Sequence, residues 1–376
     1  MSKPLRLMLA IGGLGAGGSE KQLTELLARL PREHLDPVLV TRASSGQASH
    51  LSERVIAAGI PMLEVSDPGS HPVTRWVNLS RAYARAVRTI EPDLVYAWLD
   101  ETAAILAPIC RLMQVPCLVA RRNLIGSSLE RRYRVVGHVM RRAERLATLV
   151  TANSAAVAAS SVARGHDPAR VRAVPNGHEE LPALPFPAGP TVAFGYVAQF
   201  RIEKGHHRLI DVLERLPPGP WRVDLAGEGP LQGEIEARIA RAHLEQHVRL
   251  VGPISDVRGF WRERRVAMLL SDSEGMPNAL LEAAFAGRPA IATEVGGTPE
   301  LVATSGILVP LDDPYAVVMA MQALIADPER CEQLGEQAWR RAAHEHSMAS
   351  MVEAHVDAIF ETRQLAADAA RGTHQA

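Results

Sequence analysis

The sequence predicts an α/β protein of two consecutive domains, each built from repeated βαβ units. Three observations support this. The chain has 376 residues, more than one hydrophobic core usually serves. It is 47% hydrophobic but only 4% aromatic, which suits cores of Leu, Val, Ile and Ala. Short apolar segments alternate with stretches of helical periodicity, and this alternation, typical of parallel sheets, occurs twice.

The expected strands fall into two sets. The first set covers residues 5–11, 37–41, 94–98, 117–120 and 148–152, and the second covers 192–198, 222–226, 248–251, 267–270 and 290–293. Between them lies LPALPFPAGP, whose prolines cannot continue a helix or a central strand, so we expect a hinge there. The predicted parts are a first domain (1–181), a linker (182–190), a second domain (191–345), a C-terminal helix (346–365) and a tail (366–376).

Composition excludes several classes of protein. A formal net charge of -1 argues against bulk binding of nucleic acid. Cys110, Cys117 and Cys331 show neither CxxC nor Cys/His spacing, so we expect no disulfide framework and no metal site, and a reducing cytosol is the simplest compartment. No run of 18 apolar residues is present, and the apolar segment at residues 5–11 is interpreted as a strand rather than a leader.

A glycine loop, GGLGAGGS, follows the first expected strand and precedes leucines at helical spacing. Ser19 and Gln22 have the spacing of a capping box. Gly17 and Gly18 lack side chains, so their backbone amides can approach a phosphate at the positive end of the helix. The loop therefore predicts an anion site.

The same loop leaves two alternatives open. Gly13, Gly15 and Gly18 match GxGxxG, which also suits an NADP-dependent oxidoreductase. The second strand ends in Thr41-Arg42 rather than in an acidic residue, which is compatible at best with a 2′-phosphate. The loop could also be a tight turn that binds nothing.

The most informative segment is SDSEGMPNALLEAAFAG, residues 271–287. Pro277 suits a first helical turn, which places Glu274 in a loop and Glu282 on an otherwise apolar helix. A carboxylate in such a helix is costly unless it is paired or hydrogen-bonded, and ribose hydroxyls would satisfy it. The alternative is a structural salt bridge for Glu282 and a solvated Glu274.

The backbone at the start of this helix suits a negatively charged ligand. Helix N-termini carry unpaired amides and a positive dipole, so Gly275, Met276, Pro277 and Asn278 are expected to border a sugar diphosphate. Charge on a leaving diphosphate would be stabilised there without a metal.

The segment EGMPNALLEAAFAGRP resembles the donor-site motif of the retaining glycosyltransferases of family 4, E-G-x-P-x-x-x-x-E followed by A-x-x-G-x-P. Further segments fit the same family: GGSEKQL, the pair Asn153-Ser154, PNG at 175–177, LAGEGPL at 225–231 and TEVGGTPELV at 293–302. The resemblance extends from about residue 5 to residue 359.

This resemblance implies a GT-B fold of two facing Rossmann-like domains with a cleft between them, and a C-terminal helix that returns to the first domain. The first domain would take the acceptor and the second the nucleotide sugar. The implied activity is metal-independent, retaining transfer from a nucleotide diphosphate-sugar, with UDP favoured, to a glycan or lipid-linked acceptor in bacterial-type polysaccharide or glycolipid synthesis. No cofactor is implied.

Roles of individual residues also follow from the resemblance. Lys204, in EKG, would contact the donor diphosphate, Glu282 the ribose and Glu274 the hydroxyls of the donor sugar. The amides of Gly17 and Gly18 would close on the diphosphate. Glu274, Lys204 and Arg122 are the predicted catalytic residues.

The sequence departs from the family pattern in both the donor site and the acceptor site. Gln199 stands where many relatives have Arg, and Arg201 is a candidate substitute. Where relatives often have an acceptor-side His, this sequence has Arg121, Arg122 and Asn123. Unlike His, the guanidinium group of Arg cannot act as a base, but it can hold a developing negative charge or a lipid phosphate. Glu101 is either an acceptor-site residue or a surface carboxylate. A catalytically weak protein that binds nucleotide sugars is therefore a further alternative.

A basic amphipathic helix is expected over residues 128–147. One face carries Arg131, Arg134, His138, Arg141 and Arg145. This face could rest on an anionic membrane at the inner face of the cell membrane, each cation contributing about 1 kcal/mol, or it could simply be solvated.

Overall fold

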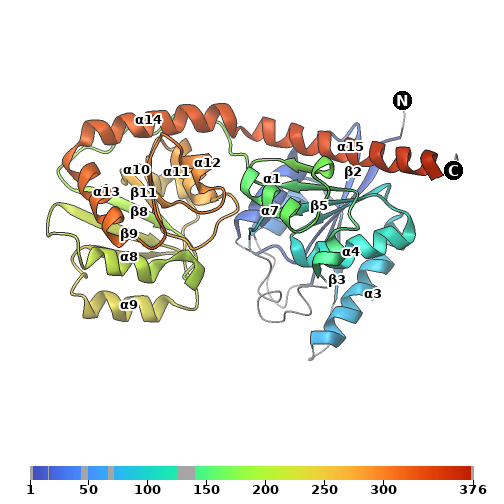
Figure 1. Cartoon of the computed structure of the whole chain (residues 1–376), viewed down its shortest axis with the longest axis horizontal. Coiled ribbons are helices and arrows are strands. Elements are labelled where there is room, and N and C mark those ends of the chain that lie inside the picture. The colour runs from blue at the N-terminus through green and yellow to red at the C-terminus, as the bar shows by residue number, and fades with distance from the viewer. Residues whose placement is uncertain (1–2, 16, 44–49, 67–71, 125–139, 374–376) are drawn as a thin grey trace. The chain divides into compact units, whose positions relative to one another are not determined.

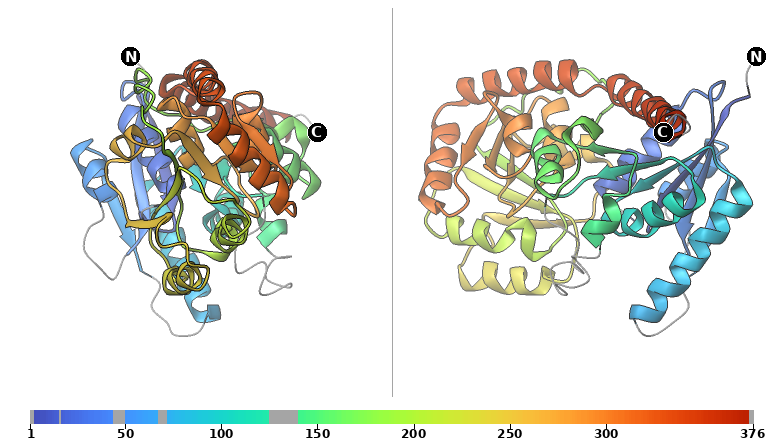
Figure 2. Two further views of the ribbon diagram at one scale, coloured as in Figure 1. Left: turned by 90° about the vertical axis from the view of Figure 1, so that its left-hand side faces the viewer. Right: turned by 45° about the vertical axis from the view of Figure 1, so that its right-hand side comes forward.

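The computed structural model describes residues 3–15, 17–43, 50–66, 72–124 and 140–373. It divides into two compact units. The first comprises Met1–Asn176 and Ala349–Ala376, and the second comprises Gly177–Met348. Each unit contains a parallel sheet with helices on both faces (Figures 1 and 2).

The sheet of the first unit has the strand order β3-β2-β1-β4-β5-β6-β7, and every neighbouring pair is parallel. The strands are β1 (Leu5–Ile11), β2 (Leu35–Arg42), β3 (Met62–Val65), β4 (Leu94–Trp98), β5 (Cys117–Arg121), β6 (Leu149–Ala152) and β7 (Val171–Ala173). The order reverses between β1 and β4. Ligands of such sheets bind outside the carboxyl ends of the strands at this reversal point.

The helices of the first unit are α1 (Gly18–Arg29), α2 (His50–Ala57), α3 (Pro72–Ile90), α4 (Asp100–Met113), α7 (Ala155–Ala163), η1 (Pro168–Arg170) and α15 (Met348–Thr373). The last of these comes from the far end of the sequence. His355 on α15 is fully buried, and its Nδ1 lies 2.8 Å from the Tyr96 hydroxyl of β4. Arg172 of β7 pairs with Glu361 of α15. These contacts make α15 part of the first unit.

The start of α1 differs from the predicted capping box. The helix begins at Gly18 with Gly17 as its N-cap, and no side chain caps it by a hydrogen bond. Ser19 lies one residue inside the helix, so its prediction as a capping residue is wrong. Instead the carboxylate of Glu20 folds back against the loop, where a Cβ on Gly17 would lie 2.2 Å from Glu20 Oε2. Burial raises the pKa of Glu20, and a hydrogen bond from its own backbone amide lowers it.

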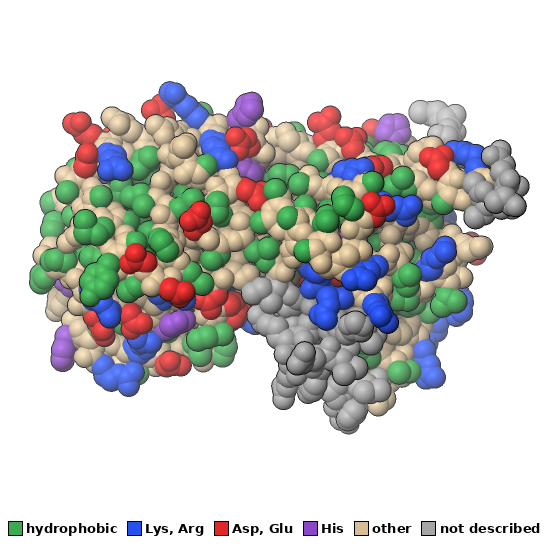
Figure 3. Space-filling model, viewed as in Figure 1, with side chains coloured by type: hydrophobic (Ala, Val, Ile, Leu, Met, Phe, Trp, Pro, Cys, Tyr) green, Lys and Arg blue, Asp and Glu red, His purple; other side chains and the backbone are tan. Residues whose placement is uncertain are grey.

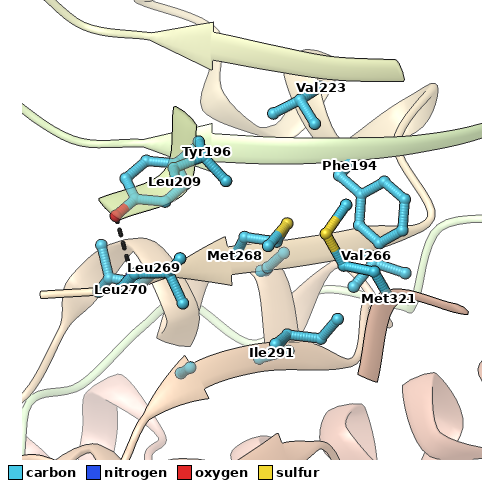
Figure 4. Close-up of a cluster of buried hydrophobic side chains, with 14 of the residues drawn as sticks. Phe194, Tyr196, Leu209, Val223, Val266, Met268, Leu269, Leu270, Ile291 and Met321 are labelled. Atoms are coloured by element: carbon cyan, nitrogen blue, oxygen red, sulfur yellow. Dashed lines mark hydrogen bonds between the residues drawn. The ribbon is translucent and has the colours of Figure 1, made fainter. Parts of the chain in front are cut away.

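The sheet of the second unit has the order β10-β9-β8-β11-β12-β13 and reverses between β8 and β11. Its strands are β8 (Val192–Val197), β9 (Trp221–Ala226), β10 (Val248–Gly252), β11 (Val266–Leu269), β12 (Ala290–Thr293) and β13 (Ile307–Val309). Buried side chains such as Phe194, Met268, Ile291 and Met321 form its core (Figure 4). The prediction of two parallel α/β domains is confirmed.

The helices of the second unit are η2 (Ile202–Lys204), α8 (His206–Leu213), α9 (Gln232–Arg241), α10 (Val257–Arg262), α11 (Asn278–Phe285), α12 (Thr298–Val302), α13 (Pro314–Ala326) and α14 (Pro328–Glu345). Three of them begin with an Asp cap: Asp256 accepts from the Gly259 amide, Asp313 from the Ala316 amide and Asp327 from the Arg330 amide. Such caps satisfy amides that have no partner within the helix.

The proline-rich segment belongs to the second unit, because the boundary between the units falls at Asn176. Its carbonyls accept hydrogen bonds from buried or half-buried side chains. Arg288 Nη2 donates to the Pro185 carbonyl at 2.8 Å, Arg265 Nε to the Pro187 carbonyl at 2.8 Å and Trp339 Nε1 to the Leu181 carbonyl at 2.9 Å. These donors attach a segment that was expected to be a separate linker.

Candidate donor and acceptor sites

The reversal point of the second sheet brings together two loops that are distant in the sequence. The loop after β8 carries Lys204, and the loop after β11 carries Glu274. Lys204 Nζ donates a hydrogen bond to Glu274 Oε1 at 2.6 Å. The Glu274 side chain is buried, whereas that of Lys204 is 27% exposed. A cation and a carboxylate therefore meet at the edge where ligands of parallel sheets bind.

A buried tyrosine fastens the first loop to the end of β11. The Tyr196 hydroxyl accepts a hydrogen bond from the Leu270 amide at 2.8 Å, as Figure 4 shows, and donates to the Lys204 carbonyl at 2.5 Å. The Asp272 amide donates to the Glu203 carbonyl at 2.9 Å. Burial raises the pKa of Tyr196 far above its usual range, so its hydroxyl keeps its proton.

The glycine of EKG is required by close packing. Gly205 has φ +66°, and a Cβ there would lie 1.9 Å from the Leu270 carbonyl oxygen. The same oxygen accepts a hydrogen bond from Arg208 Nη1 at 2.6 Å, while Arg208 Nη2 reaches Asp272 Oδ1 at 2.8 Å. Only a residue without a side chain lets the loop carrying Lys204 approach β11 this closely.

The glycine turn after β9 supports the same loop from its other side. A Cβ on Gly227, which has φ +136°, would lie 2.1 Å from the Ala198 carbonyl oxygen. The Phe200 amide donates to the Glu228 carbonyl at 2.9 Å. LAGEGPL and EKG, separate motifs in the sequence, therefore act on one structural feature: the position of Lys204.

The loop carrying Glu274 is held by its own neighbours. Ser271 Oγ donates to Glu274 Oε1 at 2.7 Å, and the Gly297 amide donates to the Glu274 carbonyl at 3.2 Å. Thr293 Oγ1 in turn donates to the Ser271 carbonyl at 2.6 Å. Sequence reasoning missed Ser271, although it opens the Glu-x7-Glu segment directly after a buried strand. The TEVGG segment contributes Thr293 and Gly297.

The remaining residues of this motif lie around the start of α11. The helix begins at Asn278, and Pro277 is its N-cap rather than part of its first turn. Gly275, Met276 and Pro277 are buried, whereas Asn278 and Glu282 are half-buried. Glu282 lies on α11, as predicted, and Arg201 is exposed at the start of η2.

The imidazole of His206, two residues after Lys204, carries no charge at neutral pH. His206 is 1% exposed and its imidazole stacks on Phe200, with ring centroids 4.4 Å apart. Burial, followed by the charges of His207 and Lys204, lowers the pKa of His206 to about 4. At neutral pH His206 therefore adds no positive charge to this loop, whereas Lys204 does.

In the first unit, the two adjacent arginines predicted for the acceptor site contact different residues. Arg121 is fully buried; its Nε lies 3.5 Å from Asp100 Oδ1 and its Nη1 donates to Ser161 Oγ at 3.2 Å. Arg122 lies over the Trp98 ring, 4.5 Å from the ring centroid. Asn123 is exposed. The structure thus separates Arg121 from Arg122 and gives Arg121 a structural ion pair.

Trp98 connects the Arg122 environment to the glycine loop. Its Nε1 donates to the Ser19 carbonyl in the first turn of α1 at 3.2 Å. Trp98 ends β4 and the glycine loop follows β1, so both lie at the reversal point of the first sheet. Gly17 and Gly18 are at the N-terminus of α1, as predicted, with the Glu20 carboxylate beside them.

Glu101 lies in the first turn of α4 and is half-buried. Burial raises its pKa, with a further increase from Asp100, whereas the positive charges of Arg42 and Arg75 lower it. Two arginines close enough to act on this carboxylate make it a charge partner within the first unit, and its predicted acceptor role stays a prediction.

Only part of the expected basic helix can be described. Arg131 and Arg134 lie outside the described residues, and residues 140–144 are helical. Arg145 is exposed, and its Nε donates to the Arg164 carbonyl at 2.8 Å. On the face seen in Figure 3, several Lys and Arg side chains gather on the first unit. Among the described residues, no helix is both long enough and apolar enough to cross a membrane.

Two family models match the chain in succession. Residues 16–179 match Glycosyltransferase Family 4, and residues 191–327 match Glycosyl transferases group 1. Together they cover more than half of the chain. The chain therefore has the two-domain architecture of nucleotide-sugar-dependent transferases, and it belongs to the GT-B glycosyltransferases. This membership does not favour the oxidoreductase alternative.

Individual relatives agree with this assignment. The chain is 26% identical to the amylovoran biosynthesis glycosyltransferase AmsD of Erwinia amylovora, over 39% of this chain and 42% of that protein. It is 25% identical to the putative glycosyltransferase EpsF of Bacillus subtilis, over 78% and 80%. The match to AmsD thus spans less than half of that relative. The crystal structure of Anabaena HepE with UDP-glucose is similar in fold, with a TM-score of 0.80, 18% identity and coverage of 95% of this chain and 100% of that one.

Proposed function

We propose that the chain transfers a sugar, with retention of anomeric configuration, from a nucleoside diphosphate sugar to a glycan or lipid-linked acceptor in polysaccharide or glycolipid synthesis. The observation that carries this proposal is the pair formed by Lys204 and Glu274 at the reversal point of the second sheet. UDP is the favoured nucleotide, in keeping with the UDP-glucose in the HepE structure.

The proposed donor site uses groups of the second unit. Lys204 would exchange its hydrogen bond to Glu274 for one to a diphosphate oxygen, because a doubly charged diphosphate is the stronger partner. The freed Glu274 carboxylate would accept hydrogen bonds from donor-sugar hydroxyls. Amides at the start of α11 would stabilise the same diphosphate, and Glu282 would bind the ribose. Arg201 is a further candidate for the diphosphate.

In the proposed reaction the bond between the sugar C1 and the diphosphate oxygen breaks, and a bond from C1 to the acceptor oxygen forms on the same face. The acceptor hydroxyl proton passes to the departing diphosphate, so no protein base is needed. Lys204 and the α11 amides stabilise the charge that develops on the leaving group. Arg122 and Asn123 are the proposed acceptor-side residues, and the Gly17 and Gly18 amides remain proposed diphosphate ligands.

A thermal unfolding series tests the proposal. UDP, GDP and their sugars are added separately, with NADPH as the control for the oxidoreductase alternative. A ligand at 100 times its dissociation constant stabilises the protein by about 2.7 kcal/mol. We expect a UDP response and no NADPH response. Absence of a response to every nucleotide contradicts the proposal, and a UDP response without release of UDP from UDP-sugars supports the binding-only alternative.

We also propose that the first unit rests on an anionic membrane surface at the inner face of the cell membrane. The sequence of α3 contains arginines but no acidic residue, and Arg81, Arg85 and Arg88 are exposed at helical spacing. Each cation near such a surface contributes about 1 kcal/mol. Arg131, Arg134, Arg141 and Arg145 remain part of the proposed surface.

Vesicle flotation tests this surface. Replacing Arg81, Arg85 and Arg88 by Glu should abolish flotation with anionic vesicles. Replacing Arg241, Arg249 and Arg262 by Glu is the matched control, because all three are exposed arginines of the second unit. Unchanged flotation of the α3 variant, or equal flotation with zwitterionic vesicles, removes the membrane proposal.

A further inference from the structure

Arg122 is a buried cation without an anionic partner among the described residues. Its residue exposure is 3%, and its Nε and Nη2 have no hydrogen-bond partner there. Its guanidinium lies over the Trp98 ring, 4.5 Å from the ring centroid. The neighbouring Arg121, by contrast, is paired with the buried carboxylate of Asp100. Among the described residues, the same strand end therefore carries one compensated and one uncompensated guanidinium.

An uncompensated buried charge is costly, because the interior replaces its hydration poorly. Stacking on an aromatic ring offsets only part of that cost. Burial lowers the pKa of Arg122 to about 10, which still leaves the guanidinium protonated at neutral pH. Such a charge is expected where a ligand supplies the missing anion.

The location of Arg122 suits a ligand group. It directly follows β5, beside Trp98 at the carboxyl end of β4, and Trp98 is hydrogen-bonded to the Ser19 carbonyl at the start of α1. This is the reversal point of the first sheet, where ligands of parallel sheets bind. Exposed Asn123 lies next in the chain and offers an amide to the same region.

We propose that Arg122 binds a phosphoryl group of the acceptor, so that the acceptor is a phosphate-bearing molecule rather than a neutral glycan. This inference rests on the proposed function, which supplies the acceptor. The planar guanidinium can donate two parallel hydrogen bonds to phosphoryl oxygens, which gives orientation as well as affinity. Arg122 thus binds and orients the acceptor and does not remove a proton. The phosphoryl group could belong to a lipid diphosphate or to a sugar phosphate.

Replacing each of the two adjacent arginines should change the thermal stability of the ligand-free protein in opposite directions. Arg122→Met removes an uncompensated charge and keeps an apolar stem over Trp98, so the unfolding midpoint should rise by about 2–4 °C. Arg121→Met is the matched control: it leaves the buried Asp100 without its guanidinium partner, so the midpoint should fall by at least as much. A fall with Arg122→Met equal to that with Arg121→Met overturns the inference, because Arg122 would then be a structural residue.

The binding test is carried out on the full chain with saturating UDP, so that Lys204 is occupied. The probes are inorganic pyrophosphate, geranyl diphosphate and glucose 1-phosphate. We expect pyrophosphate to stabilise the wild-type protein. The affinity of Arg122→Met for pyrophosphate should be at least tenfold lower than that of the wild type. A larger response to geranyl diphosphate identifies a lipid source, and a larger response to glucose 1-phosphate a sugar phosphate.

The two proposals fail in different ways. If UDP alone shifts the midpoint but all three phosphate probes bind wild type and Arg122→Met equally, or not at all, the inference on Arg122 is wrong and the donor site stands. If UDP has no effect, the proposed function fails. A pyrophosphate response that depends on Arg122 still supports the phosphoryl site in that case.

Discussion

Lys204 and Glu274 are 70 residues apart in the sequence, yet Lys204 Nζ and Glu274 Oε1 lie 2.6 Å apart at the reversal point of the second sheet. Each group also has structural support of its own: Tyr196 and Gly205 hold the Lys204 loop, and Ser271 holds Glu274. The pair is therefore preorganised. It keeps a cation ready for a diphosphate and a carboxylate ready for sugar hydroxyls.

The two glutamates of the motif should differ in their effects. Glu282→Ala is expected to weaken UDP binding by about 10–100-fold, the range for loss of a hydrogen bond to a charged group. Glu274→Ala should spare UDP affinity, because its proposed partner is the sugar, and should lower the rate of transfer. Calorimetric titration with UDP and a UDP-release assay measure both. The reverse pattern means that the roles are assigned wrongly.

Gly205→Ala should distort the loop that carries Lys204. A Cβ there would collide with the Leu270 carbonyl oxygen, in addition to the strain of φ +66°. We expect loss of UDP binding and a fall in unfolding free energy of more than about 2 kcal/mol. Gly252→Ala is the control, because Gly252 has φ +77° with no atom within 4 Å of the added Cβ. If both variants bind UDP equally well, the loop does not depend on this contact.

Tyr196→Phe tests the link between the two loops. Loss of the hydroxyl leaves the Leu270 amide and the Lys204 carbonyl without this partner. Unfolding free energy should fall by about 1–3 kcal/mol, with weaker UDP binding, because Lys204 loses its fixed position. Tyr315→Phe, at a 69% exposed position of the same unit, should change stability by less than about 0.5 kcal/mol. Equal effects of the two variants in denaturant titrations would contradict this account.

His206 should make stability depend on pH. Its pKa is about 4 in the folded protein, below the ordinary value of 6.5. The unfolded chain therefore binds the proton first, so stability is highest above pH 6.5 and falls as the pH decreases toward 4, by at most about 3 kcal/mol. His206→Phe, which keeps a ring against Phe200, should flatten this slope.

His166 in the first unit provides a comparison for that measurement. Burial and three neighbouring arginines lower its pKa to about 4 as well. In the double variant with both His206→Phe and His166→Phe, the unfolding free energy should therefore depend less on pH between pH 6.5 and 4 than in either single variant. An unchanged slope in the His206 variant rules out the buried neutral imidazole as a source of the pH dependence.

Buried strands were predictable from the sequence because burial on both faces leaves continuous apolar runs, as in β4 and β11. The short strands β3, β7 and β13 were not, since they lie at sheet edges where three or four residues need no such run. The Glu20 carboxylate at the start of α1 was missed because the Ser19 and Gln22 spacing also satisfied a capping pattern. Local sequence patterns do not reveal which of several polar side chains near a helix start will fold back onto the preceding loop.

In the candidate site, too, some features could be predicted from the sequence and others could not. The motif indicated Glu274 and Lys204 individually, but only the strand order places them within hydrogen-bond distance. Tyr196 was missed because a tyrosine inside an apolar strand has no distinguishing pattern. The divergence of Arg121 and Arg122 could have been expected, since successive residues of an extended chain point to opposite faces. Which of them has a carboxylate partner depends on Asp100, which lies on a neighbouring element.

The most direct test of the central claim is calorimetric titration of UDP into the wild-type protein and Lys204→Ala, with Arg201→Ala in parallel. We predict saturable binding to the wild type and a loss of about 10–100-fold in affinity for Lys204→Ala, the range for a charge-assisted hydrogen bond. The exposed Arg201 should matter less. Equal UDP affinity of the wild type and Lys204→Ala would contradict the donor site proposed at Lys204 and Glu274.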